Sequence, residues 1–273
     1  MKKRIITGLV TASVVLSLMG CGTSTKETTA STTAESVSET VTETQPETVS
    51  ETASESEAQT EASHRDKSIE AYKAVLESIY QGGILPDGTE LELSDINAKD
   101  ENEFAVYDVD QDGRDELVFY YTTTSMAGMT ARIYDYDEVN DCVYEELREF
   151  PMLTFYDNAT IGAPVSHNQG YAGDFWPYTF YTYDAESDTF NAEYFVDAWD
   201  KSISDVNYSG EAFPDEADKD GDGIVYYLDA PDSSEIGEPM DKDAYDAWLR
   251  ENAGDEVEVL FQKFTEENIS NIQ

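Results

Sequence analysis

The sequence predicts an α+β fold that is mainly antiparallel β-sheet or a small sandwich built from hairpins. Most of the chain after residue 100 consists of short runs rich in aromatic and β-branched residues, separated by Gly, Asp, Asn and Pro, as in strands joined by turns. Apolar residues recur at helical spacing near residue 70 and near residue 245, which predicts an N-terminal helix and short C-terminal helices. The chain lacks the regular alternation of strands and helices typical of two-lobed α/β proteins.

Residues 1–20 are interpreted as a signal peptide. They begin with a short basic segment, continue as an apolar run from Ile5 to Leu18, and lead into Leu18-Met19-Gly20-Cys21, which is similar to a bacterial lipobox. Cys21 is therefore the predicted lipidation site and the first residue of the mature protein. The lipid would hold the protein on the outer face of the cytoplasmic membrane, exposed at the cell surface. Ordinary signal cleavage and an uncleaved membrane anchor are the alternatives.

Residues 21–64 are predicted to be a disordered tether. They consist largely of Ser, Thr, Glu and Ala, so they bury too little apolar surface to offset the entropy lost on ordering. Repulsion between their glutamates extends the segment further. It is either a tether that lifts the folded part away from the membrane or a solvated spacer. Residues 65–273 are then long enough for one globular domain with its own core.

A helix is predicted over Lys67–Gln81, capped by Asp66 and ended by Gly82-Gly83. One face of this helix is aromatic and aliphatic, and we interpret it as core rather than as a ligand surface. Its residues are Ile69, Tyr72, Val75, Leu76, Ile79 and Tyr80.

The segment 108–116 places three carboxylates at alternate positions of one tight turn, followed by Gly113. Their mutual repulsion at neutral pH favours a bound cation, and Ca²⁺ is the hard, oxygen-preferring ion that fits best. A backbone carbonyl and a second-side carboxylate can complete the site. The predicted ligands are Asp108, Asp110, Asp112, Arg114 through its carbonyl, and Glu116. The alternative is an Asp-rich turn that holds no metal.

This loop resembles an EF-hand in its first seven positions. Position twelve, where an EF-hand has a bidentate Glu, is Phe119, and the flanks Phe104–Val109 and Leu117–Tyr121 favour strands over helices. The loop is therefore similar to the D-x-D-x-D-G-x-x-[DE] loops of FG-GAP repeats in integrin-type propellers, with Glu116 in the last ligand position.

The same pattern returns at Asp218, Asp220 and Asp222, followed by Gly223. With the carbonyl of Ile224 it predicts a second, weaker calcium site. Position nine here is Tyr226. An acid from elsewhere, such as Asp229 or Glu216, would have to complete the coordination.

Two segments, 134–141 and 181–188, share the pattern Y-x-Y-D-x-x-x-D and are predicted to form hairpins of one type. Between them, 166–177 is a Gly-rich loop dense in aromatic residues, which can stack on sugars beside amide groups. The candidate ligand residues are His167, Asn168, Tyr171 and Trp176. The alternative is that the aromatic residues fasten the loop to the core. One His beside one Ser is no catalytic triad.

The C-terminal part is predicted to contain two helices and a strand. Asp241 can cap a helix that carries Tyr245, Trp248 and Leu249 and is ended by Gly254. A strand is expected over Val257, Val259 and Phe261, and a short helix from Thr265. With Cys21 lipidated, the domain must hold together without a disulfide, and Cys142 is interpreted as a small apolar strand residue.

The formal net charge is −43, which excludes nucleic acid as a partner, because such a field repels phosphate backbones. It also repels anionic lipid headgroups, so contact with the membrane is expected through the lipid anchor only. The same repulsion opposes the compact state, and bound calcium should stabilise the fold.

The lipobox, the acidic tether, the helix around Ala71-Tyr72-Lys73-Ala74 and the two Asp loops resemble a group of uncharacterised surface lipoproteins of Gram-positive anaerobes with FG-GAP/EF-hand-like calcium loops. The resemblance implies a surface location and a calcium cofactor, and it implies no activity.

Two classes of function fit the sequence. The first is a non-enzymatic, calcium-binding extracellular domain that binds a glycan, a peptide or a protein. The absence of a nucleophile-base pair or a zinc motif in the sequence supports it, and no catalytic residue is assigned. The alternative is an extracellular hydrolase, such as a glycosidase with a carboxylate pair, stabilised by calcium. A substrate-capturing transport lipoprotein is disfavoured, because the two-lobed pattern is missing.

Overall fold

The computed structural model describes residues 51–92, 96–165, 177–207, 209–231 and 237–273, with side chains from residue 65 onward except at 96 and 97. Two antiparallel sheets and three α-helices account for most of these residues, which confirms the predicted α+β class. Sheet I has the order β11-β1-β2-β3-β4, and sheet II the order β10-β5-β6-β7-β8-β9.

The strands of sheet I are β1 (Glu103–Tyr107), β2 (Glu116–Tyr121), β3 (Thr130–Asp137), β4 (Cys142–Glu149) and β11 (Gln262–Lys263). Those of sheet II are β5 (Thr154–Tyr156), β6 (Thr160–Pro164), β7 (Tyr178–Asp184), β8 (Thr189–Asp200), β9 (Ile224–Asp229) and β10 (Glu256–Val257). The α-helices are α1 (Glu51–Gly82), α2 (Lys242–Asn252) and α3 (Glu266–Ser270). Short 3₁₀ turns cover Ile96–Glu101 and Met126–Gly128.

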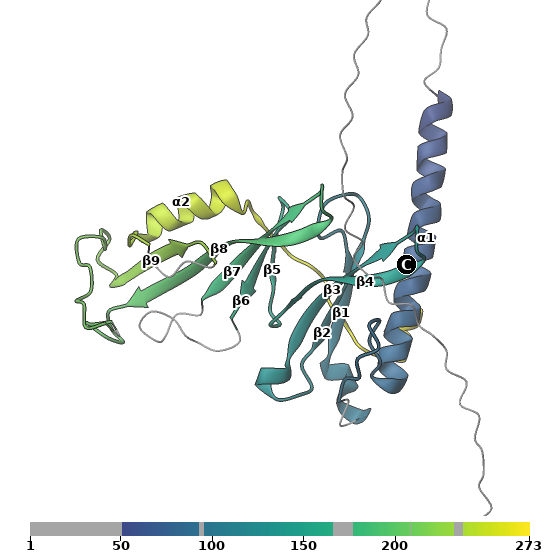
Figure 1. Cartoon of the computed structure of the whole chain (residues 1–273), viewed down its shortest axis with the longest axis horizontal. Helices are drawn as coiled ribbons and strands as arrows, with labels where there is room; N and C mark the ends of the chain where they lie inside the picture. The colour runs from purple at the N-terminus through teal and green to yellow at the C-terminus, as the bar shows by residue number, and fades with distance from the viewer. Residues whose placement is uncertain (1–50, 93–95, 166–176, 208, 232–236) are drawn as a thin grey trace, which may run out of the picture.

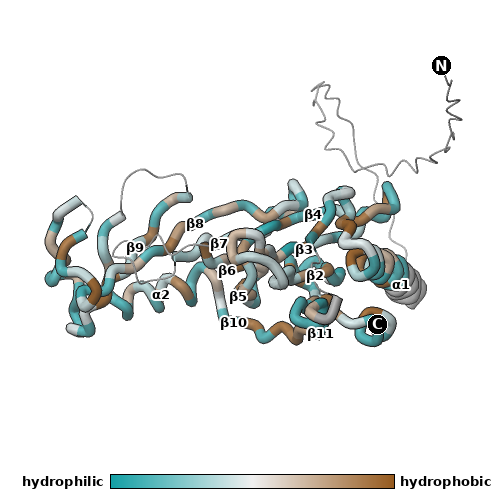
Figure 2. The backbone as a smooth tube through the Cα atoms, turned by 90° about the horizontal axis from the view of Figure 1, so that it is seen from below, coloured by the Kyte–Doolittle hydropathy of each residue, from teal (hydrophilic) through white to brown (hydrophobic). Residues whose placement is uncertain are grey.

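The elements lie in four layers: α1 with α3, sheet I, sheet II, and α2 (Figure 1). Figure 2 shows β9 and α1 at opposite ends of an elongated molecule. Because successive side chains of a strand point to opposite faces, sheet I can bury both. Phe104, Leu117 and Phe119 face the α1 layer, whereas Ala105 and Val118 face sheet II.

The α1 layer is closed by the end of the chain. Phe264 has no exposed surface, and its ring centroid lies 5.0 Å from that of Phe119 and 5.3 Å from that of Tyr80. Ile69, Tyr72, Leu76 and Ile79 of α1 are buried against the same cluster, as the helical stripe predicted.

Helix α1 begins at Glu51, well before the predicted start at Lys67, so Asp66 lies within the helix and is not its N-cap. It therefore includes the last part of the predicted tether 21–64. Residues 51–64 are rich in Glu and Ala, which have high helix propensity, so a helix nucleated on the core can extend through them. The predicted end is confirmed: Gly83 has φ +70° and donates its N–H to the Ile79 carbonyl (2.8 Å).

The two Y-x-Y-D-x-x-x-D segments form the β3–β4 and β7–β8 hairpins, as predicted. Their turns are alike. Tyr136 donates to Asp141 (2.7 Å) and Tyr183 to Asp188 (2.6 Å), and both aspartates have a left-handed φ, 53° and 54°. The shared sequence pattern therefore encodes one turn geometry in both sheets.

The C-terminal predictions hold in part. The expected strand over 257–261 is instead two short strands, β10 and β11, which belong to different sheets. Val259 and Phe261, between them, pack into the core between the sheets. Thr265 caps α3 by accepting the N–H of Asn268, as predicted (3.2 Å). None of the helices described is both long and apolar enough to cross a membrane.

Candidate metal centre

The loop between β1 and β2 is held in a tight turn by hydrogen bonds from its backbone N–H groups to its own aspartates. Asp108 accepts the N–H of Gly113 (3.2 Å), Asp110 that of Asp112 (3.0 Å), and Asp112 that of Arg114 (2.8 Å). Gly113 has φ +93°, a conformation that glycine adopts without a steric penalty. These bonds turn the carboxylates toward the inside of the loop.

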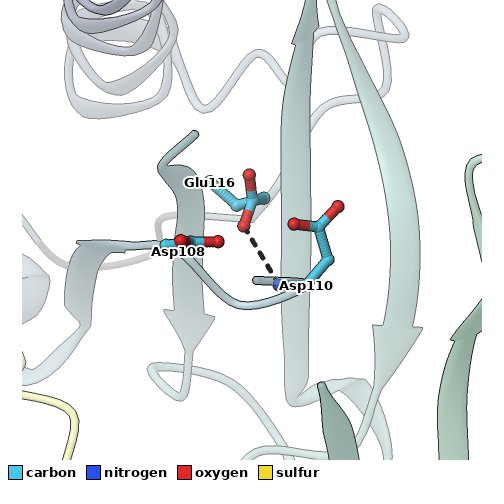
Figure 3. Close-up of side chains that lie close together, drawn as sticks. All are labelled: Asp108, Asp110 and Glu116. Atoms are coloured by element: carbon cyan, nitrogen blue, oxygen red, sulfur yellow. Dashed lines mark hydrogen bonds between the residues drawn. The ribbon is translucent and has the colours of Figure 1, made fainter. Parts of the chain in front are cut away.

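Three of the five predicted ligands come together. Carboxylate oxygens of Asp108, Asp110 and Glu116 all lie within 4.8 Å of one another (Figure 3). Glu116, at the start of β2, is 1 % exposed and accepts the N–H of Val109 at 2.6 Å. One buried oxygen of Asp108 has no hydrogen-bond partner among the described residues. Acidic side chains that could hold a metal ion therefore converge in the loop that the sequence analysis predicted.

Asp112 lies differently from the prediction, whereas the predicted ligand role of the Arg114 carbonyl stays a prediction. Both oxygens of Asp112 are engaged by Arg114, one by its backbone N–H and the other by its guanidinium, with Nε at 2.6 Å. Asp112 is thus outside the converging group, because its charge is balanced within the loop by the residue two positions later.

The electrostatics of the group are those of a site that needs a cation. Burial, with a contribution from the Asp110 charge, raises the pKa of Glu116 to about 10. Burial also raises the pKa of Asp108, with a further contribution from Asp112, and burial is the main cause of the raised pKa of Asp110. Ionising all three acids is therefore costly until a positive charge joins them.

The loop is fixed to both sheets. Gln111 has a left-handed φ of 62°, and its side-chain amide donates to the Tyr156 carbonyl of β5 at 3.2 Å. The bond crosses from the β1–β2 loop to sheet II. The loop therefore sits at the junction of the two sheets.

A second acidic group adjoins the first and shares Asp110. Its other members are Glu146 of β4 and Asp188 of the β7–β8 turn, and the three carboxylates again offer oxygens within 4.8 Å of one another. Burial, with repulsion from Asp135 and Asp110, raises the pKa of Glu146 to about 9. The sequence analysis missed this group, because its members come from three separate segments.

The second Asp loop repeats the geometry of the first. Gly223 donates to Asp218 (3.1 Å), Asp222 to Asp220 (3.0 Å) and Ile224 to Asp222 (2.7 Å), which are the same three bonds at the same loop positions. Asp218, Asp220 and Asp222 offer oxygens within 4.8 Å of one another and are more exposed than the first group. β9 begins at Ile224, so a strand follows directly here too.

An acid from outside the loop takes the place that position nine leaves open. Asp241, 5 % exposed, accepts the N–H of Lys219 at 3.0 Å. Of the two acids suggested from the sequence, Asp229 instead accepts the N–H of Gly237 (2.6 Å), and Glu216 is exposed. Asp241 was predicted as a helix cap. It stands at the N-cap of α2 but makes no capping bond with its side chain.

Two predicted sites lie outside the described residues: the lipidation site Cys21 and the candidate ligand loop with His167, Asn168, Tyr171 and Trp176. The comparisons with known proteins give no further assignment. No protein-family model matches the chain, no curated protein is detectably similar in sequence, and no solved structure matches the fold.

Proposed function

We propose that the chain is a surface-anchored lipoprotein whose extracellular domain binds calcium and acts as a non-enzymatic binding module. The observation that carries the proposal is the convergence of Asp108, Asp110 and Glu116 in a loop that joins the two sheets. Lipidation at Cys21 would supply the anchor, and the ligand would be a glycan, a peptide or another protein.

Calcium is the ion that suits this chemistry best. The group consists of carboxylates, and hard oxygen ligands select Ca²⁺ or Mg²⁺ over metals that prefer nitrogen and sulfur. Two ligands on opposite sides of Ca²⁺ are about 4.8 Å apart when each bond is about 2.4 Å, so oxygens within 4.8 Å of one another suit one ion. A loop that winds on itself tolerates the irregular coordination of Ca²⁺ better than the strict octahedron of Mg²⁺.

The burial of the most perturbed carboxylates supports a structural role over catalysis. A glycosidase acid must reach the substrate, whereas Glu116 is 1 % exposed and both oxygens of Glu146 are buried. Calcium would then hold the loop and the sheet junction in one conformation, and the ligand would bind elsewhere on the domain.

Calorimetric titration of the chelator-stripped protein with Ca²⁺, with a melting curve at each end, tests the proposal. We expect micromolar to millimolar binding and a rise in Tm, because an ion that binds only the folded state stabilises it. Asp108→Asn should weaken the tighter binding event. Glu193→Gln, an exposed change on β8, should not. No heat and no shift of Tm in the unaltered protein would refute calcium binding.

A further inference from the structure

We propose that the sheet junction holds a second oxygen-liganded divalent cation beside that of the β1–β2 loop, and that this ion binds between Asp110, Glu146 and Asp188 and joins sheet I to sheet II. The proposal rests on calcium binding at the β1–β2 loop, because Asp110 belongs to both groups. It adds an ion that the loop pattern does not predict.

The three ligands come from both sheets. Glu146 belongs to β4, in sheet I, and Asp110 to the loop that connects β1 and β2 of the same sheet. Asp188 belongs to the turn between β7 and β8, in sheet II. An ion bound by all three would therefore cross-link the layers near the bond from Gln111 to Tyr156.

Glu146 supplies the observation that points to a ligand. Both of its carboxylate oxygens are buried, and neither has a hydrogen-bond partner among the described residues. The same carboxylate lies within 4.8 Å of ligand atoms of Asp110 and Asp188. A buried polar group without a partner is destabilising, and more so when it is charged.

Asp135 and Asp188 do not share this condition. The hydroxyl of Tyr144 lies within hydrogen-bond distance of both, 2.9 Å from Asp135 and 2.8 Å from Asp188, so its one proton is shared between them, and Tyr183 donates to Asp188 (2.6 Å). The tyrosine hydroxyls thus provide hydrogen bonds to Asp135 and Asp188, whereas the carboxylate of Glu146 faces other carboxylates.

Three arginines form ion pairs with acids other than Glu146. The guanidinium of Arg114, which acts on Asp135 and Asp188 from a distance, is bound to Asp112. Arg132 of β3 and Arg148 of β4 both bind Glu145, the β4 residue next to Glu146. Because adjacent strand residues point to opposite faces, those arginines serve the other face of β4.

A proton would satisfy Glu146 less well than a cation. A protonated carboxyl gains one O–H donor, but the proton removes only one negative charge and adds no positive charge to the group. A cation would contact Glu146 and both neighbouring aspartates at once. The described group offers oxygen ligands and no sulfur or imidazole, so Ca²⁺ fits and Zn²⁺ does not.

The number of bound Ca²⁺ ions tests the inference. Calorimetry on the chelator-stripped protein should give one equivalent fewer for Glu146→Gln and for Asp188→Asn than for the unaltered protein. Asp108→Asn should weaken the loop ion, and Glu193→Gln should change nothing. Near-ultraviolet circular dichroism checks that each variant is folded, and Asp188→Asn decides the test if Glu146→Gln is not.

A spectroscopic readout locates the ion. Tb³⁺ replaces Ca²⁺ at oxygen sites and emits when tyrosine is excited nearby, and Tyr144 and Tyr183 both contact Asp188. Tyrosine-sensitised emission should fall at least about twofold in Glu146→Gln and Asp188→Asn. Unchanged emission and an unchanged equivalent count in both variants would overturn the second ion and leave calcium binding at the loop intact. Loss of binding in Asp108→Asn shows that the loop site itself is functional, so the two failures are distinguishable.

Discussion

Glu116 and Asp241 occupy equivalent places beside the two Asp loops. Each carboxylate accepts the backbone N–H of the second loop residue, Glu116 from Val109 at 2.6 Å and Asp241 from Lys219 at 3.0 Å. Glu116 is part of the first loop pattern, whereas Asp241 arrives from the start of α2. The same local geometry is therefore completed by an acid near in sequence in one case and far in the other.

Replacing Glu116 by Gln should affect the stripped and the loaded protein in opposite directions. The amide keeps the shape and can still accept from Val109, but it removes one charge. We expect Ca²⁺ affinity to fall at least about tenfold, or about 1.4 kcal/mol. The Tm of the chelated variant at pH 8 should rise, because Gln is neutral without the proton that Glu116 must take up when the protein folds at that pH. Calorimetry and melting curves measure both, and a lower Tm in chelator would contradict this account.

The second loop should depend on Asp241 and not on Asp229. Asp241→Asn removes the charge that faces Lys219, so we expect the weaker binding event to lose at least about threefold in affinity. Asp229→Asn is the matched control, because Asp229 is engaged by Gly237. Equal losses in the two variants would mean that position twelve of the loop contributes after all.

Stability in chelator should fall as the pH rises through the neutral range. The pKa values of Glu116 and Glu146 are raised to about 10 and about 9 in the folded protein, against 4.5 for an ordinary Glu. Between those values the folded state holds protons that the unfolded state has released, so raising the pH favours unfolding. The stabilisation is complete below about pH 4.5 and is lost progressively up to about pH 9 for Glu146 and about pH 10 for Glu116, at up to about 1.4 kcal/mol per pH unit for each group.

Denaturant unfolding from pH 5.5 to pH 8.5 measures this slope. Calcium at saturation should reduce or reverse it, since the ion replaces the protons, and calcium binding at pH 7 should release protons into the buffer. A chelated protein that becomes steadily more stable toward pH 8.5 would show that these carboxylates are already ionised.

Tyr144→Phe should destabilise the loaded protein by about 1–3 kcal/mol. The change removes one hydroxyl whose proton is shared between Asp135 and Asp188, across the two sheets, and it preserves the ring. Tyr194→Phe is the control, because that ring packs against Trp248 on the far side of sheet II. Denaturant midpoints measured with calcium present compare the two, and similar shifts would exclude a special role for the Tyr144 hydroxyl.

The elements that the sequence predicted well are those encoded over short distances. The stripe on α1, the turns that share Y-x-Y-D-x-x-x-D, and the Asp108–Asp110–Glu116 group each depend on residues within one turn or one loop. Local hydrogen bonds fix their geometry, so spacing along the chain is sufficient.

The sites that sequence analysis missed depend on sheet packing. Glu146 meets Asp188 because β4 and the β7–β8 turn lie at one junction, and spacing along the chain does not contain that relationship. The available signal was weak: Asp188 repeats Asp141 in the hairpin pattern, and Glu146 is an acid in an otherwise strand-like run. The role of Asp241 was ambiguous, because an aspartate before a helix can be a helix cap as well as an acid beside the second Asp loop.

Helix α1 also determines how a force on the N-terminal segment would reach the domain. Its 32 residues span about 48 Å at 1.5 Å per residue, and its first turns project beyond the sheets (Figure 1). The helix grips sheet I through Tyr72, Leu76 and Ile79 in its second half. A pulling force on the chain before Glu51 would therefore act along this helix, as shear between α1 and sheet I. β9 lies at the opposite end of the molecule, so this force would not act on it directly.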